Sequence, residues 1–205
     1  MKKFLSALLA VLILVSACAF AETASPEEPL EEGSILMRGY LDRTSLYYVS
    51  IPAEWAPIGI HSTQENIAQA NEILGESQVQ ALLKELSPEN NLLLCVSPTG
   101  EQLVITYGLS DGVTSDTLIS QVDDFKKMLS AAYVGIEFKD DCGSYSINDY
   151  IQVLYIGAKY KGHAISQYFY PAGSNMYVFT FTDTESNIIN AVLSQFRLVQ
   201  EDDLN

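Results

Sequence analysis

Apolar residues along this 205-residue chain recur with two periods, one typical of strands and one typical of helices. Short runs rich in aromatic and β-branched residues predict six strands. They lie at 45–52, 91–97, 101–108, 150–160, 163–170 and 176–182. Pro98, Thr99 and Gly100 stand between the second and third runs, which predicts a hairpin at that point.

Four other segments carry apolar residues at the spacing of a helix that buries one face. They span 64–74, 77–87, 115–132 and the segment that follows Thr182. Ser77 with Gln80, and Thr182 with Glu185, match the capping box that begins many helices. The last helix is predicted to bury a stripe of five residues: Ile188, Ile189, Val192, Leu193 and Phe196.

The strand predicted at 150–160 has apolar residues on both of its faces, with Val153 on one and Leu154 on the other. A sheet with one face in water would instead alternate apolar and polar residues. Helices are therefore expected on both faces, with Val122 and Phe125 of the third helix turned toward the sheet. The predicted fold class is α+β, an α/β/α sandwich with a central, mostly antiparallel sheet.

The first 21 residues match a signal peptide, because two lysines precede an apolar run that is too short to span a bilayer. Two processing signals overlap at its end. Residues 19–21 form a small-x-small site for signal cleavage after Ala21, whereas residues 15–18 resemble a bacterial lipobox that would make Cys18 the lipidated first residue. Export is expected from a bacterial cell, as a secreted, extracytoplasmic protein or as a membrane-anchored lipoprotein, and both alternatives stay open.

The rest of the chain is predicted to form a single domain between two acidic ends. Residues 22–37 begin with an acidic tether, 38–198 hold the predicted elements without an internal linker, and 199–205 form an acidic tail. The formal net charge of −15 argues against binding to nucleic acid and to anionic lipid. Contact with a membrane is therefore expected only through a lipid anchor at Cys18.

Two stretches resemble the PsbP-like family. "YYVSIPAEW", at 47–55, is similar to the strand-Pro-x-x-Trp opening of these domains, and "MYVFTFTDTESNIINAVLSQFRL", at 176–198, is similar to their closing strand and helix. The resemblance extends over 38–198 and includes the order of the elements. It implies an α/β/α sandwich and an accessory or binding role without catalysis. No metal, cofactor or partner site of the family can be carried over to matching residues.

The chain offers little recognisable catalytic chemistry. Its two histidines, His61 and His163, have no second histidine at metal-ligand spacing, and no hydrolase or nucleotide-binding motif is present. A nucleophilic pair of Cys142 and His163 is conceivable, although no local motif supports it. The oxygen-rich segment 139–149 does not match a calcium loop and is expected to be a solvated turn. We therefore predict no catalytic residue, metal or cofactor.

Two cysteines lie outside the signal segment. Cys95 stands in an apolar strand, where a free thiol behaves as a small hydrophobic group, and Cys142 stands in a polar turn. Exported proteins can oxidise such a pair, but only if the two side chains meet at bonding distance. Whether Cys95 and Cys142 form a disulfide is left open by the sequence.

Three aromatic residues near strand ends are candidates for contact with a ligand: Trp55, Tyr168 and Tyr170. The alternative is that they pack beneath a helix. The sequence favours a non-catalytic exported binding or accessory module of the cell envelope, whose partner would be an envelope protein, a peptide or a glycan. The alternative function is an exported hydrolase with an unrecognised active site.

Overall fold

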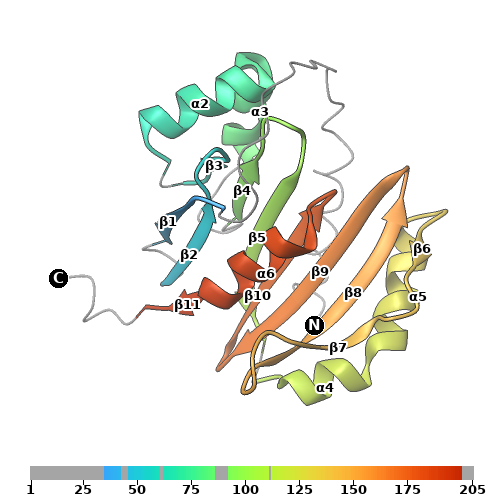
Figure 1. Cartoon of the computed structure of the whole chain (residues 1–205). Coiled ribbons are helices and arrows are strands. Elements are labelled where there is room, and N and C mark those ends of the chain that lie inside the picture. Colours follow the sequence, from blue (N-terminus) through green and yellow to red (C-terminus); the bar gives the residue numbers. More distant parts are fainter. Residues whose placement is uncertain (1–34, 43–45, 61, 86–91, 111, 200–205) are drawn as a thin grey trace.

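A computed structural model of the chain describes residues 35–42, 46–60, 62–85, 92–110 and 112–199. The central strands are β3 (Ala56–Ile58), β4 (Leu92–Val96), β5 (Gln102–Leu109), β6 (Glu137–Phe138), β7 (Gly143–Ser146), β8 (Gln152–Tyr160), β9 (His163–Ala172) and β10 (Asn175–Thr182). They form one sheet in the order β3-β4-β5-β10-β9-β8-β6, with β7 also paired to β8 (Figure 1). All of these pairings are antiparallel.

A smaller sheet is formed by strands from the two ends of the described chain. It consists of β1 (Met37–Asp42), β2 (Tyr47–Pro52) and β11 (Arg197–Leu198), in the order β1-β2-β11. Val49 and Ile51 of β2 are completely buried in a cluster that also contains Leu93 of the central sheet. The small sheet therefore packs on one face of the large one.

The helices are α2 (Gln64–Leu74), α3 (Glu76–Glu85), α4 (Ser115–Ser120), α5 (Val122–Ala132) and α6 (Ser186–Gln195). The hydroxyl of Thr63 caps α2 by accepting a hydrogen bond from the Asn66 backbone N–H, at 3.2 Å. Thr114 caps α4 in the same way through the backbone N–H of Thr117. These caps satisfy N–H groups that have no partner inside the helix.

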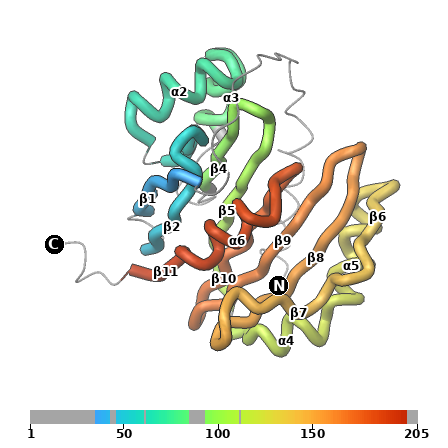
Figure 2. The backbone as a smooth tube through the Cα atoms, viewed as in Figure 1, coloured from blue at the N-terminus to red at the C-terminus, as the bar shows by residue number. Residues whose placement is uncertain are grey.

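Alternate residues of the central strands point to opposite faces of the sheet, and each face is covered. Phe179 of β10 packs with α6 and the small sheet, whereas its neighbour Val178 packs with α4 and α5. Val104 of β5 lies on the same face as Val178 and packs with α2 and α3. Figure 2 shows α6 crossing the sheet over β5 and β10, while α2 and α3 lie at the β3–β4 end and α5 lies at the β8 end. The predicted α/β/α sandwich with an antiparallel central sheet is confirmed.

Four local predictions were wrong. The capping box expected at Ser77 and Gln80 does not begin a helix, because α3 begins at Glu76 and Ser77 lies inside it. The helix expected at 115–132 is broken at Gln121 into α4 and α5. The predicted capping box at Thr182 is absent, since Thr182 ends β10, and Glu185 is the N-cap of α6 without a side-chain hydrogen bond. The segment 139–149, expected to be a turn, contains the strand β7.

Several predictions fall outside the described residues. These include the signal peptide at 1–21, with Cys18 and Ala21, most of the acidic tether, and the acidic tail beyond residue 199. The described part of the chain contains no helix that is both long and apolar enough to cross a membrane.

Candidate functional site

A pocket of about 440 Å³ opens on the face of the central sheet that carries α6. Its floor is formed by Tyr155 of β8, Tyr168 of β9 and Phe181 of β10, and its walls include Tyr145 of β7 and Ile189 of α6. We call this site the tyrosine pocket. Small-molecule sites in proteins commonly have volumes of about 300–1,000 Å³, so the tyrosine pocket has the size of a ligand site.

The aromatic rings of the tyrosine pocket hold one another in place. Tyr155 and Tyr168 are direct partners in the β8–β9 pairing, and their ring centroids lie 5.1 Å apart at an angle of 30°. Tyr145 meets Tyr168 edge to face at 4.9 Å, and Phe181 does so at 5.9 Å. Each such aromatic pair stabilises the fold by about 0.5–1.5 kcal/mol beyond the contribution of its buried area. The rings are therefore ordered before any ligand arrives.

The hydroxyl of Tyr155 has an unusual position in this pocket. It lies over Gly157, the next residue of β8 on the same face, and a Cβ atom at residue 157 would clash with it. The Tyr155 residue is only 7 % exposed and lines the pocket. A phenol hydroxyl can both donate and accept a hydrogen bond, so this group can pair with a ligand that offers either one.

The rim of the tyrosine pocket is polar and its charges are balanced. Lys139 and Asp141 contribute one positive and one negative charge. Asn190 of α6 accepts a hydrogen bond from the hydroxyl of Tyr145. Four further hydroxyl groups line the pocket, from Ser144, Ser166, Thr184 and Ser186. The rim thus presents many short hydrogen-bonding groups and no net charge.

Tyr145 and Tyr168 keep their protons at neutral pH. Burial, reinforced by the nearby Tyr145, Tyr155 and Asp141, raises the pKa of Tyr168 above its ordinary value. Burial, together with Tyr155, also raises the pKa of Tyr145. Since a phenol with a raised pKa is a poorer nucleophile or base at neutral pH, these groups act here as hydrogen-bonding groups.

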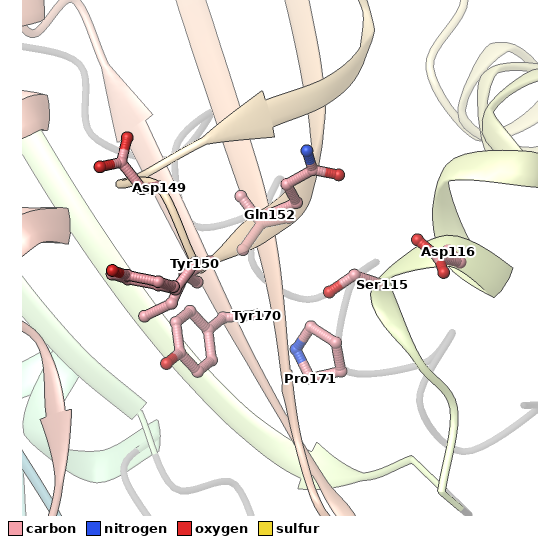
Figure 3. Close-up of a pocket in the computed structure, with 9 residues that line it drawn as sticks. Ser115, Asp116, Asp149, Tyr150, Gln152, Tyr170 and Pro171 are labelled. Atoms are coloured by element: carbon pink, nitrogen blue, oxygen red, sulfur yellow. The ribbon is translucent and has the colours of Figure 1, made fainter.

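A second pocket, of about 450 Å³, lies where β8 begins and β9 ends (Figure 3). We call it the edge pocket. Tyr150, which is 93 % exposed, and Tyr170 lie close together in it. Asp116 of α4 and Asp149 lie on opposite sides of these rings in the view of Figure 3. The edge pocket therefore combines exposed aromatic surface with negative charge.

The three candidate contact aromatics have different positions. Trp55 is completely buried in the core between the two sheets, so the expectation that it reaches the surface is wrong. Tyr168 belongs to the floor of the tyrosine pocket, and Tyr170 lines the edge pocket. A contact role for Tyr168 and Tyr170 stays a prediction.

Cys142 and His163 are held by different partners. The Cys142 thiol lies 3.3 Å from the backbone oxygen of Gly157, whereas His163 Nδ1 lies 2.6 Å from a carboxylate oxygen of Asp183. Neither residue lines the tyrosine pocket. Cys95 and Cys142 are both free thiols, and burial raises the pKa of Cys95 well above its ordinary value.

No group of three or more His, Cys, Asp or Glu side chains with metal-binding geometry occurs among the described residues. In the segment 139–149, the strand β7 separates the acidic residues of one end from those of the other. Asn148 uses its side-chain oxygen to accept hydrogen bonds from the backbone N–H groups of Tyr150 and Ile151. That oxygen therefore stabilises a turn.

Sequence reasoning missed two of the three tyrosines in the pocket, Tyr145 and Tyr155. Tyr145 lies in a segment whose polar composition gave no strand signal, and Tyr155 lies in a strand that is apolar on both faces. The antiparallel pairing of β7 with β8 brings them together, with ring centroids 6.1 Å apart. Only this pairing, which the sequence did not predict, would have identified the cluster.

The chain is similar in fold to a cyanobacterial PsbP protein. The solution structure of CyanoP from Synechocystis sp. PCC 6803 matches with a TM-score of 0.50 and 13 % identity, over 84 % of this chain and 98 % of that one. A crystal structure from Bacteroides thetaiotaomicron VPI-5482 matches with a TM-score of 0.47 and 10 % identity, over 80 % of this chain and 49 % of that one. No family description and no curated protein matches the sequence. The chain has a PsbP-like fold, as the sequence predicted.

Proposed function

We propose that this protein is a non-catalytic, exported binding module of the bacterial cell envelope and that it binds its ligand in the tyrosine pocket. The observation that carries the proposal is the aromatic floor of the pocket, together with the Tyr155 hydroxyl that is held over Gly157. A preformed apolar surface with a few convergent polar groups is the usual composition of a ligand site.

The chemistry of the pocket supports binding more than catalysis. Catalysis by a nucleophile needs a base within hydrogen-bonding reach. The candidate nucleophile Cys142 contacts backbone atoms of Lys139 and Gly157, and His163 contacts Asp183. The pocket itself supplies aromatic rings, hydroxyls, one amide and two opposite charges. These groups can orient a ligand without activating it.

The proposed location rests on the N-terminal sequence. A signal peptide at 1–21 followed by an acidic tether suits a domain that is either released after Ala21 or anchored through a lipid on Cys18. In both cases the tyrosine pocket would face the extracytoplasmic space, where envelope peptides and glycans are available.

The test compares the purified protein with one variant that blocks the pocket and one that does not. Ala164→Trp places a large side chain at an exposed β9 residue of the pocket, on the same face of the strand as Tyr168. Ser146→Trp is the control, because Ser146 is an exposed strand residue of β7 that does not line the tyrosine pocket. Both substitutions introduce a residue that strands accept well.

Each immobilised protein is exposed to an extract of bacterial envelopes, and the retained small molecules are identified by mass spectrometry. We expect at least one compound to be retained by the original protein and by Ser146→Trp but not by Ala164→Trp, and to be recovered chemically unchanged. Equal retention by all three proteins, or no retention by any, would refute pocket binding. Recovery of a cleaved product would instead favour the hydrolase alternative.

A further inference from the structure

We propose that the tyrosine pocket binds a neutral, hydroxyl-rich ring, namely one or two sugar residues of a glycan. This inference rests on the proposed function and specifies the chemical class of its ligand. It follows from three properties of the pocket taken together: an aromatic floor, a tyrosine hydroxyl held in a defined position over Gly157, and a dense rim of short polar groups without net charge.

The floor suits the apolar side of a sugar ring. Tyr155, Tyr168 and Phe181 stand on three adjacent strands and present aromatic carbon toward the α6 side of the sheet. A sugar ring exposes C–H groups on its faces and hydroxyls at its edge. Its C–H face can pack on these rings, since tyrosine combines a large apolar surface with a polar end.

The Tyr155 hydroxyl supplies a defined polar contact. It is held over Gly157, and the Tyr155 side chain lines the pocket. A ligand hydroxyl can both donate to and accept from a phenol, so a sugar can form a hydrogen bond with Tyr155 whether the phenol is the donor or the acceptor. A purely apolar ligand would leave the hydroxyl without a partner and would bind less well.

The rim favours a ligand without net charge. Lys139 and Asp141 carry opposite charges, so the rim as a whole gives no net electrostatic attraction to an anion or to a cation. The formal net charge of −15 adds a long-range penalty for anions. The remaining rim groups are hydroxyls and one amide, which match the alternating donors and acceptors of a polyol.

The experiment titrates the purified protein with maltose, cellobiose and N,N′-diacetylchitobiose, with tri-alanine as a peptide probe and digalacturonate as a charged probe. Binding is followed by calorimetry, and the site is located from backbone amide shifts in NMR spectra. We expect at least one neutral saccharide to bind and to shift the amides of Tyr155 and Ser166, while digalacturonate binds more weakly.

Two variants report on the pocket and one serves as control. Tyr155→Phe removes the hydroxyl. It should weaken saccharide binding about three- to tenfold, because one hydrogen bond to the ligand is lost. Gly157→Ala should weaken it as well, because the new Cβ displaces the same hydroxyl. Tyr40→Phe is the control: it also removes a tyrosine hydroxyl, which is buried and has no partner among the described residues, and Tyr40 does not line the pocket. Its affinity should be unchanged.

The outcomes separate this inference from the proposed function. If no saccharide binds, or if Tyr155→Phe and Gly157→Ala bind as tightly as the original protein, the assignment of a sugar ligand is wrong. If tri-alanine binds in the pocket and the saccharides do not, the ligand class is wrong. In each of these cases the proposed function still stands if Ala164→Trp abolishes the retention of an envelope compound. If Ala164→Trp does not abolish that retention, the proposed function is wrong.

Discussion

Phe196 should be the most sensitive single position in the core that joins the two sheets. It follows α6 directly and is 7 % exposed. Its ring centroid lies within 4.9–5.8 Å of four other rings, which belong to β2, β9 and β10. These partners are Tyr47, Tyr170, Tyr177 and Phe179. The side chain therefore contacts the small sheet and the central sheet at once.

Replacing Phe196 by Ala should lower the free energy of unfolding by about 3–5 kcal/mol, the range for a buried Phe whose cavity cannot collapse. That is a large share of the roughly 5–15 kcal/mol that stabilises a domain. Phe196→Leu keeps most of the volume but loses the edge-to-face contacts, and should cost about 1–2 kcal/mol. Urea unfolding followed by circular dichroism measures both.

The control for this experiment is Tyr150→Ala, which removes an aromatic ring that is 93 % exposed. It should change the unfolding free energy by less than about 0.5 kcal/mol. A loss below about 1 kcal/mol for Phe196→Ala would mean that the two sheets do not depend on this ring, and the packing argument would be wrong. A Phe196→Leu variant as unstable as Phe196→Ala would contradict the separate contribution of the aromatic contacts.

Three other predictions concern buried hydroxyls, alkaline pH and the N-terminus. Tyr40→Phe should leave thermal stability unchanged or raise it, because the lost hydroxyl is buried without a partner; a fall of several degrees in the melting temperature would contradict this. Burial raises the pKa of Tyr133 to about 12, so its neutral form is favoured in the folded state. The stability from such tyrosines should be constant below about pH 10 and should be lost as the pH rises further, with tyrosinate absorbance increasing together with unfolding; tyrosinate forming without unfolding would refute the coupling. The intact mass of the native product should show either a chain that begins at Glu22 or an acylated chain that begins at Cys18, and Cys18→Ala should abolish only the second. A product that still carries residues 1–17 would rule out both.

The sequence predicted most of the fold because the apolar period is strong where elements bury a face. The stripe from Ile188 to Phe196 was predicted and is buried, and the hairpin of β4 and β5 was predicted and is paired. The break at Gln121 could not be predicted, because no Gly or Pro marks it and the apolar spacing of α4 continues into α5. Periodicity defines the buried face of a helix but does not reveal a change in its direction.

The candidate site was much harder to predict than the fold. Tyr168 was singled out, but its neighbours in the pocket come from β7, β10 and α6, which are distant in sequence. Trp55 was singled out because it follows a strand, yet it lies in the core with its indole N–H unpartnered. A strand-end position indicates the surface only if no second sheet packs there, and the small sheet was not predicted.

Small residues at paired positions make room for the large rings of the tyrosine pocket, since the Tyr155 hydroxyl occupies the space over Gly157. Gly157 of β8 pairs directly with Ser166 of β9, beside the large rings of Tyr155 and Tyr168. Protein interiors are normally packed as densely as organic crystals, and unfilled volume lowers stability. At the other end of the same sheet face, Phe196 and its ring partners fill the corresponding space. A face that is closely packed at one end and open at the other, with the Tyr155 side chain lining the open end, has the arrangement that a ligand would complete.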